Sequence, residues 1–307
     1  MKACIDIGGT KVAVSLNDGS GLELVARRSE PTAKEGDNDA LAVQVLRMVE
    51  AACAEAGVPS GQVQCAGVSS CGPFVMVDRR IELAAPNICG GLAGGGRGLP
   101  NDWMTALLEA PLAQRFRQLR IENDCVAALE AERRWGALQG VDDCAYVTWS
   151  TGIGTGLCVD GHVLRGKNGN AGHAGHMFVS DNDDALCGCG NIGDLEALVA
   201  GASVAHRFGA DAATLLKRAQ AGDAGAVRIV EELCRVLGRG LYNLVVTLDL
   251  RRISLGGSVY WNNRDYLLPR LREHVAGHLP ALTAGCELVT AGLENRVGDY
   301  AALALIA

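Results

Sequence analysis

The sequence predicts an α/β protein whose mixed sheets are flanked by helices. Short apolar runs of strand length alternate along the chain with stretches of helical periodicity, which is typical of this class. Three of the apolar runs are followed directly by glycine-containing turns, and no internal repeat or long linker separates the elements. The 307 residues are 49% hydrophobic, so the chain can bury a large core in one large domain or in two of ordinary size.

The first part of the chain combines short strands with one helix. Apolar stretches at 3–7 and 12–16 are separated by a glycine turn, which predicts two strands. Apolar residues recur at helical spacing from Leu41 to Ala52, and Gly57 then marks the end of a helix. The elements expected here are strands over 3–7, 12–16, 22–27 and 63–68 and a helix over 41–52.

The rest of the chain is increasingly helical. The dipeptide Asp160-Gly161 suits a tight type I′ turn and predicts a hairpin. Six of the nine residues 90–98 are glycine, which predicts either a plain surface loop or a mobile loop at the mouth of a substrate site. The elements expected here are helices over 125–135, 224–247 and 266–276, strands over 144–149 and 252–255, and a hairpin over 157–164.

Composition argues against several classes of partner. The formal net charge is −7 and no basic stripe is present, so nucleic acid is not the expected partner. No apolar run approaches the roughly 18 residues of a membrane helix, and Asp6 interrupts the short apolar N-terminus, unlike a signal peptide. The 12 cysteines are mostly single residues in apolar runs, as in reduced proteins with buried thiols. We therefore expect a cytoplasmic protein that binds neither nucleic acid nor membrane.

Three turns that follow strands are candidate phosphate-binding sites. Glycine lets backbone amides approach a phosphate that a Cβ would keep away, and a hydroxyl group adds a donor. Each turn alone is more often a plain turn, but three of them carry more weight. The turn at 150–156 matches neither the dinucleotide fingerprint nor the phosphate loop that ends in Gly-Lys-Ser/Thr. The three segments are 6–11, 150–156 and 255–258.

The pair Asn123-Asp124 lies between the first two of these turns, after a strand and before a helix. Asn and Asp are favoured as helix N-caps, so a structural cap explains the pair. The alternative is that Asp124 is a general base that takes a proton from a substrate hydroxyl. The segment itself does not decide between these two roles.

A possible zinc site lies between residues 172 and 196. His176, Cys187 and Cys189 are typical zinc ligands that are close together in the sequence, and Asp194 is a candidate fourth ligand. The alternative is a pair of free thiols together with two surface histidines, His173 and His176.

Together these motifs resemble the ROK family of sugar kinases, which has the two-lobed actin-like ATPase fold, related to that of ribonuclease H. The resemblance runs in order over nearly the whole chain, and the combination is far more specific than any single motif. The matching segments are Asp6-x-Gly8-Gly9-Thr10-Lys11, Gly72-Pro73, Pro86-Asn87, Asn123-Asp124, 151–156, Gly175-His176, Cys187-x-Cys189-Gly190-x-x-Gly193, Glu196 and Leu255-Gly256-Gly257.

The resemblance implies transfer of the γ-phosphoryl group of ATP to a sugar hydroxyl, usually the 6-hydroxyl, with Asp124 as base and Mg²⁺ neutralising the phosphates. It implies two lobes, 1–121 with 293–307 and 122–292, which close on a cleft where ATP and sugar meet, and a homodimer or higher homo-oligomer. The implied ATP- and phosphate-binding residues are Asp6, Gly8, Gly9, Thr10, Lys11, Thr151, Gly152, Gly154, Gly256 and Gly257. The implied sugar-binding residues are Gly72, Asn87, Asn123, Asp124, His173, His176 and Glu196, and a structural Zn²⁺ would be held by His176, Cys187, Cys189 and Asp194.

Two positions depart from the family pattern. The third cysteine of the family's zinc motif is Asp194 in this chain, which makes zinc binding weaker or absent. The residue three before the zinc histidine is commonly Glu in the family, and here it is His173. A similar His occurs in the bacterial N-acetylmannosamine kinases of this family, which favours an N-acylated sugar alongside a simple hexose.

Three other functions are alternatives to the kinase. Some family members are sugar-responsive repressors with an N-terminal helix-turn-helix, for which the motif at Asp6 leaves no room in this sequence. A non-catalytic sugar sensor has no need of an acid at position 124. A nicotinamide dehydrogenase needs a dinucleotide fingerprint and a ribose-binding acid, which the sequence lacks.

Overall fold

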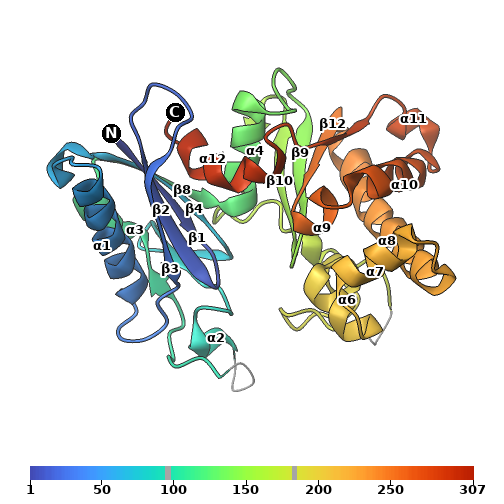
Figure 1. The fold of residues 1–307 in the computed structure, drawn as a ribbon, viewed down its shortest axis with the longest axis horizontal. Helices are drawn as coiled ribbons and strands as arrows, with labels where there is room; N and C mark the ends of the chain where they lie inside the picture. Colours follow the sequence, from blue (N-terminus) through green and yellow to red (C-terminus); the bar gives the residue numbers. More distant parts are fainter. Residues whose placement is uncertain (94–97, 182–184) are drawn as a thin grey trace. The chain divides into compact units, whose positions relative to one another are not determined.

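The computed structural model describes residues 1–93, 98–181 and 185–307. These residues form two compact units, which are described separately below (Figure 1). Unit 1 comprises Met1–Ala131, Arg165–Ala171 and Gly298–Ala307, and unit 2 comprises Glu132–Leu164 and Gly172–Val297. The lobe boundary expected near residue 121 remains a prediction.

Unit 1 is built on a five-stranded sheet with the strand order β3-β2-β1-β4-β8. The neighbouring strands β1, β4 and β8 are parallel, and Ile7, Ser70 and Asn123 are aligned at their carboxyl ends. The segments that follow these three strands therefore leave the sheet at the same edge. The strands are β1 (Lys2–Ile7), β2 (Lys11–Asn17), β3 (Val25–Pro31), β4 (Cys65–Ser70) and β8 (Gln118–Asn123).

Helices cover both faces of this sheet (Figure 1). On one face, α1 packs an apolar stripe that includes Leu41, Val45 and Val49 against β2 and β3. On the other face, α12 approaches β4 so closely that a Cβ on Gly67 would lie 2.1 Å from the carbonyl oxygen of Ala302. The helices are α1 (Ala40–Glu55), α3 (Glu109–Arg115), α4 (Asp124–Trp135) and α12 (Val297–Ala304).

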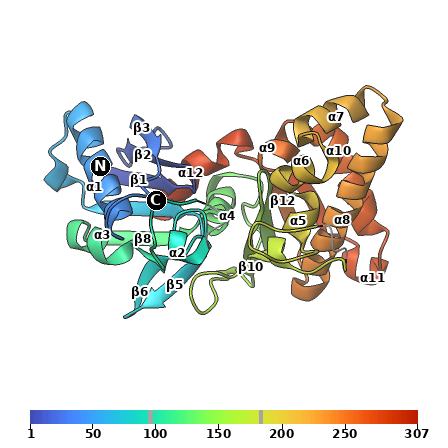
Figure 2. The same ribbon diagram turned by 90° about the horizontal axis from the view of Figure 1, so that it is seen from below.

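A second, three-stranded sheet in unit 1 begins with the antiparallel β5–β6 hairpin (Figure 2). The expected loop over 90–98 is partly wrong, because its first residues form the short helix α2. The amide of Gly90 binds Asn101 Oδ1 at 2.8 Å, and the amide of Gly91 binds the carbonyl oxygen of Trp103 at 3.0 Å. Residues 94–97 of that loop lie outside the described residues. The elements are β5 (Phe74–Val77), β6 (Arg80–Leu83), α2 (Gly90–Ala93) and β7 (Ala106–Leu107).

Unit 2 contains a five-stranded sheet with the order β11-β10-β9-β12-β13. The turn Asp160-Gly161 joins β10 and β11, and both residues have positive φ (50° and 73°), so the predicted tight hairpin is confirmed. β12 runs parallel to both of its neighbours, with Gly256 opposite Thr148. The strands are β9 (Cys144–Trp149), β10 (Ile153–Val159), β11 (His162–Val163), β12 (Arg252–Gly256) and β13 (Glu287–Thr290).

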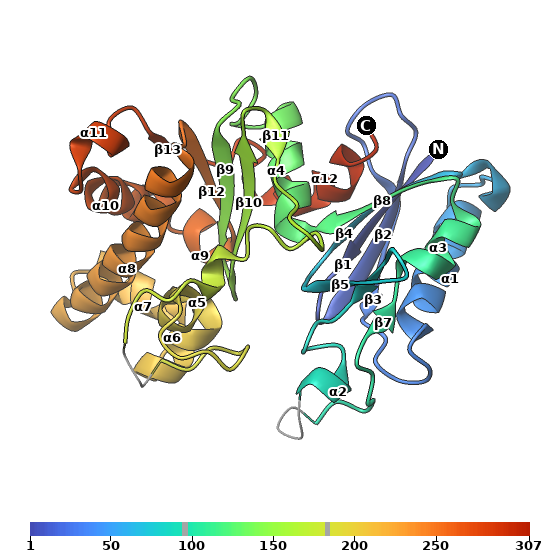
Figure 3. The ribbon, with the colours of Figure 1, turned by 180° about the vertical axis from the view of Figure 1, so that it is seen from behind.

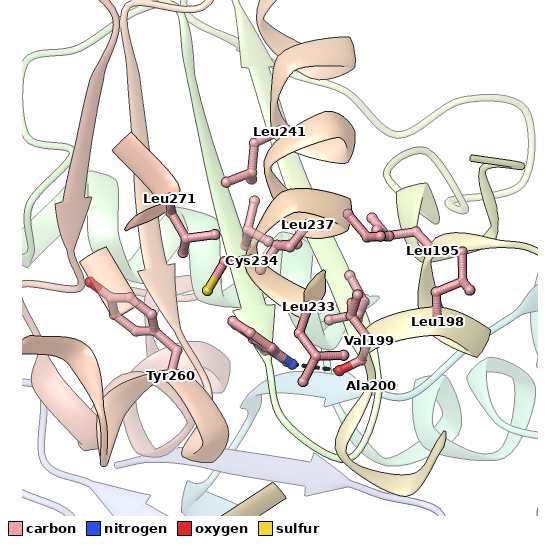
Figure 4. Close-up of a cluster of buried hydrophobic side chains, with 14 of the residues drawn as sticks. Leu195, Leu198, Val199, Ala200, Leu233, Cys234, Leu237, Leu241, Tyr260 and Leu271 are labelled. Carbon is pink, nitrogen blue, oxygen red and sulfur yellow. Dashed lines mark hydrogen bonds between the residues drawn. The ribbon is translucent and has the colours of Figure 1, made fainter. Parts of the chain in front are cut away.

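The helices of unit 2 enclose its main core. The side chain of Asp223 caps α8, which lies with α10 on one side of the sheet (Figure 3). Leu233, Leu237 and Leu241 of α8 point into a cluster with Leu195 and residues of α10 (Figure 4). The helices are α5 (Leu195–Val199), α6 (Gly201–Phe208), α7 (Ala212–Gln220), α8 (Ala224–Leu248), α9 (Ser258–Trp261), α10 (Arg264–Ala276) and α11 (Pro280–Thr283).

The strand expected over 22–27 is displaced to β3. Antiparallel pairing places Leu16 opposite Val25, and the preceding residues form a turn around the buried Asn17 side chain. The side-chain Nδ2 of Asn17 donates to the carbonyl oxygens of Gly21 and Glu23, both at 2.9 Å. The other expected elements are present, with β4 starting two residues later than expected. In the described part of the chain, no helix combines the length and the apolar character that crossing a membrane requires.

Candidate functional site

One edge of the unit 1 sheet carries the first group of predicted site residues. The turn at 8–10 follows β1, Gly72 follows β4 shortly after its end, and Asp124 directly follows β8. Because these parallel strands end in register, the three segments lie at the same edge. Ligands of open α/β sheets bind at the carboxyl ends of parallel strands, so this edge is a candidate substrate site.

The predicted phosphate turn is held in place by backbone contacts. The amide of Gly8 donates to the carbonyl oxygen of Lys11 at 2.9 Å. The Thr32 hydroxyl donates to the Gly8 carbonyl oxygen at 2.7 Å, and the Thr32 amide donates to that of Thr10 at 3.1 Å. Thr32 was not singled out from the sequence, because its role depends on a contact 24 residues away.

Asn87 packs directly against this turn. A Cβ on Gly9 would lie 2.0 Å from the Nδ2 atom of Asn87, so only glycine fits at position 9 beside the amide side chain. The predicted sugar-binding Asn87 and the predicted phosphate turn are therefore in contact. Thr10, Lys11 and Asn87 are exposed, so their side chains are accessible to ligands.

Asn123 and Asp124 both interact with the start of α4. The backbone amide of Cys125 donates to Asn123 Oδ1 at 3.0 Å and to Asp124 Oδ1 at 2.8 Å. Asn123 is buried, whereas Asp124 is exposed as the first residue of the helix. A buried side chain that binds the first turn and an exposed carboxylate beside it are compatible with a cap and a general base at adjacent positions.

Asp6 is the second carboxylate at this edge. The side chain is half-buried near the end of β1, and Ser69 Oγ donates to it at 3.2 Å. Burial raises the pKa of Asp6 to about 6, with a further contribution from the negative charge of Asp124. Since the negative charge of Asp124 disfavours ionisation of Asp6, a cation at this edge would stabilise the ionised Asp6 carboxylate.

We expect Asp6→Asn to stabilise the ligand-free protein above pH 6. The native pKa of about 6 exceeds the ordinary value of 3.8, so the native state binds more protons and loses stability as pH rises between these values. The variant lacks this loss, so the difference between its free energy of unfolding and that of wild type should grow in its favour from pH 4 to pH 7. Urea unfolding across this range without nucleotide measures the difference, and a difference independent of pH would contradict the prediction.

Two further predicted turns meet in unit 2. β9 and β12 are parallel, so the segment at 150–154 and the pair Gly256-Gly257 lie at the same edge of the second sheet. Gly257 has φ 88°, and a Cβ there would lie 2.5 Å from Thr148 Oγ1. The close approach of Gly257 to the end of β9, together with its positive φ, accounts for glycine at this position.

The four predicted zinc ligands lie together in unit 2. One ligand atom from each of them lies within 4.8 Å of the others. His176 Nδ1 is 3.2 Å from Asp194 Oδ2, 3.5 Å from Cys189 Sγ and 3.8 Å from Cys187 Sγ. Ligand atoms of a tetrahedral zinc site stand about 3.3–3.8 Å apart, given Zn–N near 2.0 Å and Zn–S near 2.3 Å. The four residues therefore fit a zinc ion.

Asp194 has two functions in this cluster. Its Oδ1 accepts a hydrogen bond from the amide of Ala197 at 2.7 Å and caps α5, while Oδ2 faces His176 and lies 3.6 Å from Cys189 Sγ. Burial alone would raise the pKa of Asp194, but the hydrogen bonds from His176 and Ala197 outweigh it and lower the pKa. The carboxylate is thus held in its ionised, ligand-competent form without the family's third cysteine.

We expect protein purified without chelators to contain about one zinc per chain. Cys187→Ala should lower this content sharply because it removes a thiolate ligand, whereas Cys286→Ala, which changes a cysteine outside the cluster, should not. Elemental analysis provides the measurement. Zinc near zero in a stably folded wild type would mean that the cluster is a hydrogen-bonded loop.

Two more predicted sugar-binding residues adjoin the cluster. The ring of His173 stacks near that of His176, with centroids 6.2 Å apart and an angle of 26° between the planes. Glu196 Oε1 lies 3.5 Å from Cys187 Sγ, and its Oε2 accepts a hydrogen bond from the amide of Ile153 at 2.9 Å. The structure therefore joins Glu196 to the turn at 150–154, a contact that the sequence motifs did not predict.

Comparisons with known proteins cover the whole chain. The ROK family model matches residues 2–307. An N-acetylmannosamine kinase of Salmonella paratyphi A is 34% identical over 266 residues, covering 83% of this chain and 82% of that protein. A glucokinase of Aeropyrum pernix is 27% identical over 325 residues, covering 98% and 95%. The crystal structure of a ROK hexokinase from Thermus thermophilus has a TM-score of 0.77 and 32% identity, and 99% of this chain and 97% of that chain are covered.

The fold, the strand-edge turns and these relatives define a sugar kinase with the actin-like ATPase fold. The chain belongs to the ROK family.

Proposed function

We propose that this kinase transfers the γ-phosphoryl group of ATP to the 6-hydroxyl of a hexose or an N-acylated hexosamine. One observation carries the proposal: the exposed carboxylate of Asp124 lies at the same sheet edge as the turn at 8–10. Relatives named as a glucokinase and as an N-acetylmannosamine kinase support both sugar classes. The proposed location in the cytoplasm and a homodimer remain predictions.

The groups of unit 1 activate the acceptor in this proposal. Asp124 takes the proton of the acceptor hydroxyl while the oxygen of that hydroxyl forms a bond to the γ-phosphorus. The bond between the γ-phosphorus and the oxygen that bridges to the β-phosphate breaks, and ADP is released. Asn87, Asn123 and Gly72 hold the sugar, and the backbone and hydroxyl of the turn at 8–10 hold phosphate oxygens, assisted by Lys11. Mg²⁺, when bound with ATP, would neutralise phosphate charge, and Asp6, near the end of β1 just before this turn, is the carboxylate suited to hold it.

The groups of unit 2 hold the nucleotide and orient the sugar. Thr151, Gly152, Gly154, Gly256 and Gly257 offer amides and a hydroxyl to phosphates at one sheet edge. Since His176 Nδ1 faces the cysteine cluster, its Nε2 is the atom that would bind a sugar hydroxyl. Zn²⁺, when bound, would fix the orientation of this ring.

His173 is the proposed determinant of sugar class. A carboxylate at this position can only accept hydrogen bonds, whereas a neutral imidazole can also donate one to an acetamido oxygen. If the substrate is N-acylated, His173→Glu should lower kcat/KM for the N-acetyl sugar more than for the parent hexose. The measurement is kcat/KM of both proteins for N-acetylmannosamine, N-acetylglucosamine, glucose and mannose. A wild-type enzyme that strongly prefers glucose would refute the proposal of an N-acylated substrate and leave the proposed kinase function unaffected.

A non-catalytic sugar sensor is the alternative function. ADP release on adding a panel of sugars separates the two, because a sensor binds a sugar without consuming ATP. Sugar binding without any ADP release, in protein that also binds ATP, would overturn the proposed function.

A further inference from the structure

Glu196 contacts both the cysteine cluster and the turn at 150–154. It is the second residue of α5, and the capping bond from Ala197 to Asp194 holds the start of that helix. Its Oε1 atom lies 3.5 Å from Cys187 Sγ. Its Oε2 atom accepts from the amide of Ile153 at 2.9 Å, at the point where β10 begins.

The contact with the turn is close as well as polar. A Cβ on Gly152 would lie 2.7 Å from Glu196 Oε2, so the carboxylate occupies the space beside this glycine. The turn is closed by a bond from the amide of Ser150 to the carbonyl oxygen of Gly152 at 3.0 Å. On its other side, the amide of Gly201 binds the carbonyl oxygen of Ser150 at 2.8 Å. The side chain of Glu196 and the start of α6 therefore support the turn from two sides.

We propose that Glu196 is a positioning residue for the nucleotide, acting through the turn at 150–154, in addition to any contact with sugar. The inference rests on the proposed function, in which this turn binds ATP phosphates. A hydrogen bond from a backbone amide to a carboxylate is among the stronger hydrogen bonds, and it fixes the orientation of the peptide between Gly152 and Ile153. The same carboxylate links the turn to Cys187, so the turn and the metal cluster share one support.

The test is nucleotide affinity in the absence of sugar, because a residue that only contacts sugar cannot change it. ADP with Mg²⁺ is titrated calorimetrically into wild type, Glu196→Ala and Glu196→Gln. We expect Glu196→Ala to weaken ADP binding about tenfold, as the loss of a charge-assisted hydrogen bond does. Glu196→Gln should bind ADP within about twofold of wild type, because its amide oxygen can still accept from Ile153.

Two further variants control for indirect effects. Glu232→Ala removes a half-buried glutamate of α8 that pairs with Arg235 in the same unit, and it should leave ADP affinity unchanged. Gly152→Ala should weaken ADP binding by displacing the Glu196 carboxylate. If Glu196→Ala does not fold, this variant tests the same contact in its place. In the double variant Gly152→Ala/Glu196→Ala the two losses of ADP affinity should not add, because both substitutions act through one contact.

The outcomes separate this inference from the proposed function. If Glu196→Ala binds ADP like wild type while its KM for sugar rises, the positioning role is refuted and the proposed kinase function is unaffected. Wild type that binds no ADP would refute both.

Discussion

Replacing Asp124 by Asn should lower kcat by at least about 100-fold while leaving the Kd values for sugar and ATP little changed. The amide has nearly the same shape as the carboxylate and can still accept the hydrogen bond from the Cys125 amide, so the start of α4 is preserved. It cannot take a proton from the acceptor hydroxyl. The expected loss is therefore in turnover and not in binding.

Steady-state kinetics and calorimetric binding of each substrate check this result. Asp78→Asn is the matched control, because Asp78 is an exposed aspartate of the same unit in the turn between β5 and β6. Its φ of 49° is one that Asn tolerates, so its kcat should stay at the wild-type value. If Asp124→Asn keeps most of its turnover, Asp124 is a helix cap and another group is the base.

Glu132→Ala is expected to lower the free energy of unfolding by about 3–5 kcal/mol, because it leaves buried donors without partners. Glu132 lies near the end of α4 and is 0% exposed. Its Oε2 accepts from the amides of Ala137 and Gly292, both at 2.9 Å, and from Ser254 Oγ at 3.0 Å. Its Oε1 accepts from the amide of Leu293 at 2.8 Å.

Urea unfolding followed by circular dichroism gives the size of this effect. Glu132→Gln should lower the free energy of unfolding by less, roughly 1–3 kcal/mol, because its side-chain oxygen can still accept hydrogen bonds from the three donors that bind Oε2. Glu273→Ala is the control, since Glu273 is exposed on α10 and its loss should change stability by no more than about 0.5 kcal/mol. A Glu132→Ala protein as stable as this control would show that water or other groups satisfy the four donors.

Features that depend on neighbouring residues could be predicted from the amino-acid sequence alone. Periodicity located α8 and α10 to within two residues at each end, and strand β9 was predicted with its observed bounds. The dipeptide Asp160-Gly161 specified its hairpin because both residues adopt positive φ at low cost. The ordered motifs indicated the family, which the match over residues 2–307 shows.

Features that depend on contacts between remote segments became visible only in the folded structure. The glycine-rich start of α2 is helical because residues near Asn101 bind and enclose it, which no local propensity predicts. The buried Glu132 looks like an ordinary helix glutamate until its donors from β12 and the segment after β13 are in place. Likewise, the contact of Glu196 with Ile153 joins residues 43 positions apart. Hydrogen bonds over such separations form only when the sheets and helices pack, so a pattern of neighbouring residues cannot predict them.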